Sequence, residues 1–187
     1  MGVAVVTDST HYLPAAIVAA NALHAVPLYV TFDGTLARES DMLDLQDFYE
    51  RLRGAASDMP TTSQPSIGDF LACYEPLLEA GHDIVSIHIS AGISGTYGSA
   101  LQARDELAAR GHDGRVEVLD SRTVCGGLGL VLLAAAASAR AGASLDEIVR
   151  HAEAARAGLR IWFSLDTLEY LRRGGASAAR RLGSAAR

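Results

Sequence analysis

Hydroxyl and carboxyl side chains stand directly after several short apolar runs of this sequence, where they could bind an anion. The segments are Asp8-Ser9-Thr10, Ser90 to Thr96 and Asp120-Ser121. If the apolar runs are parallel strands, their carboxyl ends meet at one edge of a sheet, and ligands of open α/β sheets bind at that edge. The same residue types also cap helices, and for Ser9, Thr10, Asp120 and Ser121 capping is the simpler interpretation.

Ser94 lies in the glycine-flanked segment 92–95, which predicts a sharp turn that lets the backbone approach a ligand. Its hydroxyl and the amides of Gly95 and Thr96 would lie at a helix N-terminus, a favourable place for an anion. Two alternatives stay open for this serine. It could only cap the helix, or it could be the nucleophile of a serine hydrolase of small acyl esters, for which neither His82 nor His88 is an obvious general base.

The segment 61–66 offers four hydroxyls and one amide directly before a predicted helix. Pro65 favours an extended Gln64, so we expect a defined loop over 57–65. Neutral donors of this kind suit a carboxylate better than a polyphosphate.

The composition removes several classes of chemistry. All 16 basic side chains are arginine, against 22 acidic ones, and the formal net charge is −6. Without lysine the chain has no Walker P-loop, no Schiff-base amine and no protein-kinase lysine. Net negative charge also argues against nucleic acid as a partner, since cationic side chains supply most of that affinity.

Cysteine content and hydropathy indicate a soluble, cytoplasmic protein. Two cysteines, Cys73 and Cys125, fit a reduced compartment without a disulfide framework. The N-terminus lacks the basic and apolar regions of a secretory signal. The longest apolar stretch, 125–139, is shorter than the roughly 18–20 residues of a membrane span, so we expect no stable membrane insertion.

Other candidate motifs are weaker. The six histidines show no metal-ligand spacing, so we expect no metal, and His88 is predicted to be a core or strand-face histidine. The segment 127–129 only partly resembles a dinucleotide fingerprint. Cys125, beside glycines at a predicted helix start, could have a lowered thiol pKa, although an inert buried thiol is the simpler interpretation.

Short β-branched runs alternate with alanine-rich helical stretches, which predicts an α/β fold with a mostly parallel sheet in a three-layer α/β/α domain. Strands are expected at 3–7, 24–32, 84–89, 116–119 and 159–164, with a tight hairpin turn at Asp33-Gly34. Helices are expected at 14–21, 45–53 after an Asp44 cap, from Ser66 with Asp69 three residues on, and at 96–110, 127–140, 144–156 and 166–173.

Charge is distributed unevenly along the chain. Residues 1–149 carry a net charge of −11 and residues 150–187 a net charge of +5. Such a shift is compatible with a solvated basic helix end, and it also predicts a domain junction near residue 157.

Segments spread over nearly the whole chain resemble the DegV family of bacterial fatty-acid-binding proteins. They are Val6-Thr7-Asp8-Ser9-Thr10 with Leu13-Pro14, Val26-Pro27-Leu28 with Asp33-Gly34, Thr62-Ser63-Gln64-Pro65-Ser66, Ile87-His88-Ile89-Ser90 with Ile93-Ser94-Gly95-Thr96-Tyr97, Asp120-Ser121 with Gly126 to Leu130, and 166–171 with Arg173-Gly174-Gly175. The most specific part is TSQPS followed by SGTY, with Ser94 standing 32 positions after Thr62.

The resemblance implies two α/β domains that hold one long-chain fatty acid between them, with the acyl chain in an apolar tunnel. The fatty-acid carboxylate would meet the hydroxyls of Thr62 and Ser94. Further candidates near it are Ser63, Gly95 and Thr96, with Asp8, Ser9, Ser121 and Arg173 in supporting positions.

The resemblance also implies a carrier without a cofactor, not an enzyme. It would present the fatty acid to a separate ATP-dependent fatty acid kinase subunit, which makes the acyl phosphate for phospholipid synthesis. Residues 1–157 would form the N-terminal domain, and 158–187 the first strand and helix of a second, smaller α/β domain. Family members are longer than this chain, a histidine that usually helps hold the carboxylate has no counterpart, and Ala176 stands where the family often has a basic residue. An interaction module whose hydroxyls only cap helices is a third alternative.

Overall fold

The structure, a computed structural model, describes residues 2–41, 45–54, 59–162 and 164 of the chain. Its main sheet, sheet A, consists of β1 (Val3–Asp8), β2 (Leu23–Val26), β6 (Asp83–His88) and β7 (Val116–Asp120), in the order β2-β1-β6-β7 with all neighbours parallel. The helices around it are α1 (Ala15–Ala20), α3 (Ile67–Glu79), α4 (Thr96–Leu107), α5 (Cys125–Arg140) and α6 (Leu145–Gly158).

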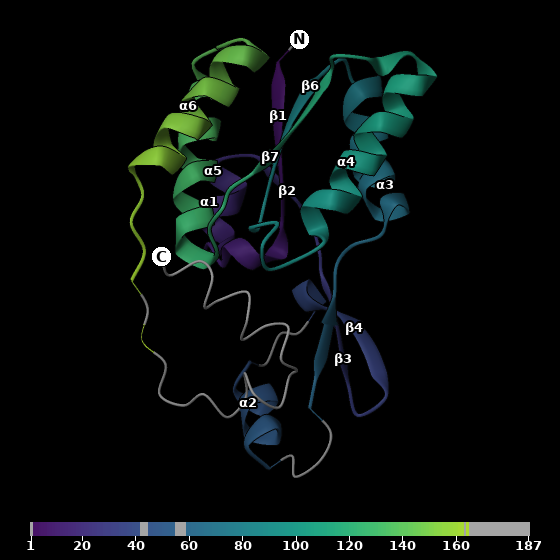
Figure 1. The fold of residues 1–187 in the computed structure, drawn as a ribbon, viewed down its shortest axis with the longest axis vertical. Helices are drawn as coiled ribbons and strands as arrows, with labels where there is room; N and C mark the ends of the chain where they lie inside the picture. Colours follow the sequence, from purple (N-terminus) through teal and green to yellow (C-terminus); the bar gives the residue numbers. More distant parts are fainter. Residues whose placement is uncertain (1, 42–44, 55–58, 163, 165–187) are drawn as a thin grey trace.

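Helices cover both faces of sheet A, with α3 and α4 on one side and α5 and α6 on the other (Figure 1). Alternate residues of the central strands therefore enter two separate cores. Val6 and Ile84 pack with Phe70 and Tyr74 of α3, whereas Val85 packs with the apolar side of α5. Burial on both faces explains why these strands read as nearly continuous apolar runs. The predicted three-layer α/β/α arrangement with a parallel sheet is confirmed.

A second sheet interrupts this pattern between β2 and α3. Sheet B is antiparallel and consists of β3 (Tyr29–Phe32), β4 (Thr35–Arg38) and β5 (Thr61–Ser63), in the order β4-β3-β5. The hairpin turn between β3 and β4 is confirmed at Asp33 and Gly34, which have φ values of 49° and 73°. Helix α2 (Leu45–Gly54) and the turns η1 (Ser9–His11), η2 (Glu39–Asp41) and η3 (Ala108–His112, a π-helical turn) complete the elements.

Three expectations about strands were wrong. The single strand expected at 24–32 is two strands in different sheets, because Pro27 has no N–H to continue the ladder of sheet A. Thr61–Ser63 is a strand of sheet B and not a loop. Residues 159–162 and 164, expected in a strand, are in neither a helix nor a strand.

Sheet B and α2 lie beyond the carboxyl ends of the strands of sheet A (Figure 1). The expected cap Asp44, the helix at 166–173 and the candidate Arg173 lie outside the described residues. The domain junction near residue 157 thus stays a prediction. Among the helices that the structure describes, none is long and apolar enough to cross a membrane.

Candidate functional site

The strand order of sheet A places a topological switch point between β1 and β6. The chain continues from β1 to β2 on one side, whereas β6 lies on the other side of β1. The connections that leave β1 and β6 therefore diverge, and ligands of open α/β sheets bind in the crevice that this opens at the carboxyl ends. Two of the predicted hydroxyl segments, Asp8 to Thr10 and Ser90 to Thr96, follow these two strands.

Pairing within sheet B sets the direction of the hydroxyls in β5. Thr62 pairs opposite Val30 of β3, and Ser63 pairs opposite Tyr29. Because successive side chains of a strand point to opposite faces, Thr62 shares a face with the buried Val30, whereas Ser63 lies on the face of Tyr29. Both hydroxyl residues are exposed. The two candidates of this strand thus point in different directions.

A capping box fixes the step from β5 into α3, as the sequence predicted. The Ser66 hydroxyl accepts the backbone N–H of Asp69 at 3.1 Å, and the Asp69 carboxylate accepts the N–H of Ser66 at 2.8 Å. The Tyr29 hydroxyl donates to Asp69 at 2.9 Å, so β3 is tied to the same helix end. Burial opposes ionisation of Asp69, but the hydrogen bonds from Ser66 and Tyr29 outweigh it and lower the pKa.

Ser94 lies in a tight turn that leads into α4. The carbonyl of Ser90 accepts the N–H of Ile93 at 2.9 Å and that of Ser94 at 3.1 Å. The Ser94 hydroxyl lies 2.9 Å from the hydroxyl of the fully buried Thr96 and accepts the Thr96 N–H at 3.3 Å. Gly95 is the N-cap and supplies no side-chain hydrogen bond. Ser94 therefore supports the helix start, and its half-buried side chain keeps a solvent-facing side.

The structure brings the two hydroxyl segments into contact through Gln64 and Gly95. A Cβ atom placed on Gly95 would lie 2.8 Å from Nε2 and 3.0 Å from Cδ of Gln64. These distances are shorter than ordinary van der Waals contact, so the Gln64 amide lies directly against the backbone of Gly95. The segment of Thr62 and the turn of Ser94 consequently meet at the carboxyl edge of sheet A.

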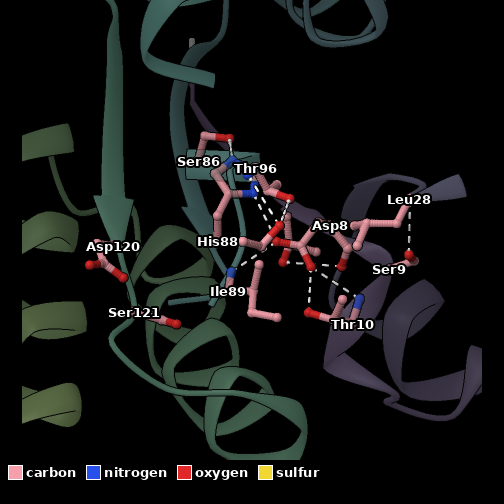
Figure 2. A network of polar contacts seen from close by, with 12 residues as sticks. Asp8, Ser9, Thr10, Leu28, Ser86, His88, Ile89, Thr96, Asp120 and Ser121 are labelled. Atoms are coloured by element: carbon pink, nitrogen blue, oxygen red, sulfur yellow. Dashed lines mark hydrogen bonds and ion pairs between the residues drawn. The ribbon is translucent and has the colours of Figure 1, made fainter. Parts of the chain in front are cut away.

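Asp8 is the centre of a buried polar network at the same edge (Figure 2). Its Oδ1 accepts the N–H of Thr10 at 3.0 Å and the Thr10 hydroxyl at 2.5 Å. Its Oδ2 accepts the N–H of Ile89 at 2.9 Å and lies 3.1 Å from Nδ1 of His88. Burial raises the pKa of Asp8, but His88, Thr10 and Ile89 together hold it below its ordinary value.

A chain of hydrogen bonds continues from His88 into the core, and it assigns the proton positions. The Tyr74 hydroxyl donates to the Ser86 hydroxyl at 2.7 Å, and Ser86 lies 2.7 Å from Nε2 of His88. If Ser86 donates to Nε2, then Nδ1 carries the imidazole proton and donates it to Asp8, so that every proton finds an acceptor. His88 is a core histidine, as the sequence predicted.

The arrangement of Ser86, His88 and Asp8 has the composition of a hydrolase triad but not its accessibility. All three side chains are 0% exposed, and Tyr74 already donates to the oxygen that would attack. Ser94 also lacks a general base. Both ring nitrogens of His88 are hydrogen-bonded to other residues, and His82 precedes β6 at the opposite edge of sheet A. Within the part of the chain that the structure describes, the geometry gives Ser94 no histidine base.

The remaining candidates bind neighbouring segments of the protein. The Ser9 hydroxyl accepts the N–H of Leu28 at 3.1 Å and donates to Glu39, which joins β1 to sheet B. Ser121 donates its N–H to the carbonyl of His88 at 3.0 Å, and its hydroxyl accepts the N–H of Thr123 at 3.3 Å. Both lie at the carboxyl edge and both stabilise the turns there.

Two further sequence interpretations are settled by packing. Cys125 is exposed, so the expectation of a buried thiol is wrong. Partial burial of the thiol and the nearby Glu39 carboxylate raise its pKa, so the expectation of a lowered pKa is also wrong. A Cβ on Gly129 would lie 2.8 Å from the side chain of Leu13, and one on Gly127 would clash with Ile161. These glycines allow close packing at the start of α5. Among the described residues, no group of three or more histidine, cysteine or acidic side chains could hold a metal ion.

Sequence reasoning missed Gln64 as the contact between the two hydroxyl segments, and it missed the Tyr74–Ser86–His88 chain. The second had a signal: Ser86 and His88 alternate with apolar residues in a strand buried on both faces. Buried polar side chains are nearly always hydrogen-bonded, so their partners could have been sought in advance.

A surface hollow of about 250 Å³ lies at the other edge of sheet A, where the strands begin. It is lined by Gly2, Asp83 and Ser144 among others, and it lies far from the hydroxyls of Thr62 and Ser94.

The chain resembles known proteins over its whole length. The family model described as "Uncharacterised protein, DegV family" matches residues 2–187. A DegV domain-containing protein of Deinococcus radiodurans is 42% identical over 182 residues, which cover 95% of this chain and 63% of that protein. Protein DegV of Bacillus subtilis is 39% identical over 187 residues, which cover 98% of this chain and 65% of that protein.

Solved structures share the fold. A DegV family protein from Thermus thermophilus, described by its fatty acid binding, matches with a TM-score of 0.84 and 36% identity over 98% of this chain and 64% of its own. DegV from Bacillus subtilis, described as a fatty acid binding protein, matches with the same TM-score, identity and coverage. The chain thus spans less than two thirds of the length of these relatives. On the match of its sequence and its fold, this chain belongs to the DegV family.

Proposed function

We propose that this protein binds one long-chain fatty acid, with the carboxylate held by the hydroxyls of Thr62 and Ser94 and the acyl chain in an apolar tunnel. The observation that carries the proposal is the contact of the two hydroxyl segments at the switch point of sheet A, where Gln64 lies against Gly95. The relatives from Thermus thermophilus and Bacillus subtilis, which are described as fatty acid binding, support the choice of ligand.

The chemistry of the site suits a carboxylate. A hydrogen bond to a charged group contributes about 1.5–3 kcal/mol, so two hydroxyls can fix the position of the head group. Burying a tail of about 14 methylenes contributes on the order of 11 kcal/mol before the costs of ordering are subtracted. The tail then supplies affinity, and the hydroxyls supply orientation.

Other residues complete the proposed site. Gly95 offers its backbone N–H at the start of α4, where an anion is favoured, whereas Thr96 already donates its N–H to the Ser94 hydroxyl and supports the site through that residue. Ser63 contributes less than Thr62, because its side chain lies on the other face of β5. Arg173 remains a candidate partner from residues 158–187, which we propose begin a second, smaller domain.

We further propose that the protein is a cytoplasmic carrier and not the catalyst. A separate ATP-dependent kinase subunit would phosphorylate the bound fatty acid. The absence of lysine from the sequence supports this division, since the common ATP-binding motifs use that residue. The serine-hydrolase alternative has no such support, because the described residues give Ser94 no base.

Titration of the delipidated full chain with palmitate tests the proposal. Thr62→Ala and Ser94→Ala should each raise the Kd by about tenfold, the loss of one hydrogen bond to a charged group. Ser63→Ala is the matched control, one residue along the same strand, and should change the Kd by less than about threefold. Equal affinity of the wild-type protein and a Thr62→Ala, Ser94→Ala double variant would overturn the proposed site.

A further inference from the structure

Asp8 joins the ends of β1 and β6 and leaves no position on its carboxylate for a ligand. Its two oxygens accept from the backbone and hydroxyl of Thr10, from the backbone of Ile89 and from Nδ1 of His88. The side chain is fully buried. Whatever Asp8 does for binding, it does through the residues that it holds.

One of those residues begins the turn that carries Ser94. β6 ends at His88, and the N–H of Ile89 is fixed by Asp8 at 2.9 Å. The next residue, Ser90, donates its N–H to the carbonyl of Thr123 at 3.0 Å, and its own carbonyl accepts the N–H of Ser94 at 3.1 Å. Ile89 is therefore linked to Ser94 by one peptide bond and one backbone hydrogen bond.

His88 and Thr10 fix the Asp8 carboxylate in its turn. The imidazole of His88 is held on one side by Ser86 at 2.7 Å and packs edge-on against the ring of Phe70, with centroids 5.0 Å apart. Thr10 holds the other oxygen with two hydrogen bonds, of which the hydroxyl supplies one. The orientation of the carboxylate is over-determined, which is what a support for a binding turn requires.

We propose that Asp8 is a positioning residue for the carboxylate site, and that it sets the place of the Ser94 hydroxyl through Ile89. The inference rests on the proposed function of Ser94. His88 and Thr10 act indirectly, because they hold the Asp8 carboxylate in place. Tyr74, at the far end of the same hydrogen-bonded chain, is separated from Asp8 by Ser86 and His88 and does not take part.

The test compares variants at both ends of the chain by palmitate titration and thermal unfolding. Asp8→Asn has one carbonyl oxygen in place of two carboxylate oxygens, so it cannot accept from Thr10, Ile89 and His88 together, and Thr10→Val removes one hydroxyl donor. Both should raise the Kd for palmitate by about tenfold, because a misplaced Ser94 loses its hydrogen bond to the carboxylate. Thr10→Ser restores the hydroxyl and should restore affinity to within about twofold.

Tyr74→Phe is the matched control for stability. It removes one buried hydrogen bond from the same chain, so it should lower the unfolding temperature yet leave the Kd within about twofold of wild type. If Asp8→Asn does not fold, the Thr10→Val and Thr10→Ser pair decides. Equal Kd values for Thr10→Val and wild type, or for a folded Asp8→Asn and wild type, would overturn the inference.

NMR of the ligand-free protein gives a readout that is independent of the proposed function. The amide signals of residues 89–96 should shift in Asp8→Asn and Thr10→Val and stay in place in Tyr74→Phe. Failure of the wild-type protein to bind palmitate would overturn the proposed function. Unchanged amide signals in Thr10→Val would overturn the positioning role of Asp8.

Discussion

Asp8 stays ionised inside the protein because four donors replace the water that it has lost. The carboxylate is fully buried, and burial alone would raise its pKa. The hydrogen bonds and the positive potential of its partners lower the pKa below the ordinary value of 3.8. A buried charge with every partner in place is tolerated, whereas removing one partner is costly. The network at the end of β1 is therefore a structural requirement as well as a support for the site.

The lowered pKa of Asp8 predicts how stability depends on pH. Because the pKa is lower in the folded than in the unfolded state, Asp8 contributes stability above the unfolded value of 3.8 and loses it as pH falls through the folded value. Asp8→Asn should thus be destabilised by about 3 kcal/mol at neutral pH. The difference from wild type should shrink below a pH of about 4. Chemical unfolding across a pH series measures it; a difference that is constant down to strongly acid pH would contradict an ionised Asp8.

A second prediction concerns the effect of a substitution at Gly95 on palmitate binding. Its φ of −76° suits any residue, so Gly95→Ala should change stability by less than about 1 kcal/mol. The new Cβ must nonetheless displace the Gln64 amide from its present position. We expect the Kd for palmitate to rise by about tenfold, because the two hydroxyl segments no longer meet in the same way.

Gly98 supplies the control for this experiment. It lies three residues further along α4, and a Cβ there meets no atom within 4 Å. Gly98→Ala should stabilise the protein by up to about 1 kcal/mol through helix propensity and leave the Kd unchanged. If Gly95→Ala and Gly98→Ala bind palmitate equally well, the contact with Gln64 does not matter for binding.

Two helices, α3 and α6, begin with a capping box. Ser66 with Asp69 begins α3, and Ser144 with Glu147 begins α6, and both boxes follow from the sequence alone. The first stands directly after β5 and Gln64, whereas the second lies at the opposite edge of sheet A, beside the hollow there. Two capping boxes of the same kind therefore stand at different distances from the proposed site.

This pair predicts a separation of stability from binding. Ser66→Ala and Ser144→Ala should each lower the free energy of unfolding by about 1 kcal/mol, because Ser66 loses its bond from the Asp69 N–H and Ser144 loses its hydroxyl bond to the Glu147 carboxylate. Only Ser66→Ala should weaken palmitate binding, since only that helix start fixes the segment of Thr62. Parallel urea unfolding and palmitate titration measure both quantities. A loss of affinity in Ser144→Ala equal to that in Ser66→Ala would show that binding follows general stability.

The strands β1, β6 and β7 of sheet A and the capping boxes of two helices could be predicted from the sequence because local signals and burial agree there. The strand Val3–Asp8 and the helix starts at Ser66 and Ser144 are examples. Sheet B could not be predicted in the same way. Thr61–Ser63 is a three-residue polar strand whose only evidence is its pairing with β3, which depends on tertiary contacts. Pro27 interrupts the single strand expected over 24–32, and the change of sheet that follows it depends on tertiary contacts.

The candidate site, too, could be predicted only in part from the sequence. The hydroxyls at strand ends were visible as residue types, and the switch point explains why they gather at one edge. Which of them face one another depends on sheet B, so the contact of Gln64 with Gly95 had no signal in the sequence. The buried chain from Tyr74 to Asp8 joins residues 66 positions apart, and only the fold brings them together.

At the scale of the whole molecule, two sheets with different construction carry the two halves of the proposed site. Sheet A supplies the turn of Ser94, and sheet B supplies Thr62. Hydrogen bonds of Ser9 with Leu28 and Glu39, which flank β3 and β4, connect sheet B to the end of β1. The chain spans less than two thirds of the length of these relatives.

Native mass spectrometry of the full chain, purified without added lipid, tests the central claim most directly. We predict one adduct per chain with the mass of a long-chain fatty acid, retained by Ser63→Ala and lost from the Thr62→Ala, Ser94→Ala double variant. A bare chain that also fails to take up palmitate, or an adduct that the folded double variant retains as fully as wild type, would contradict the account.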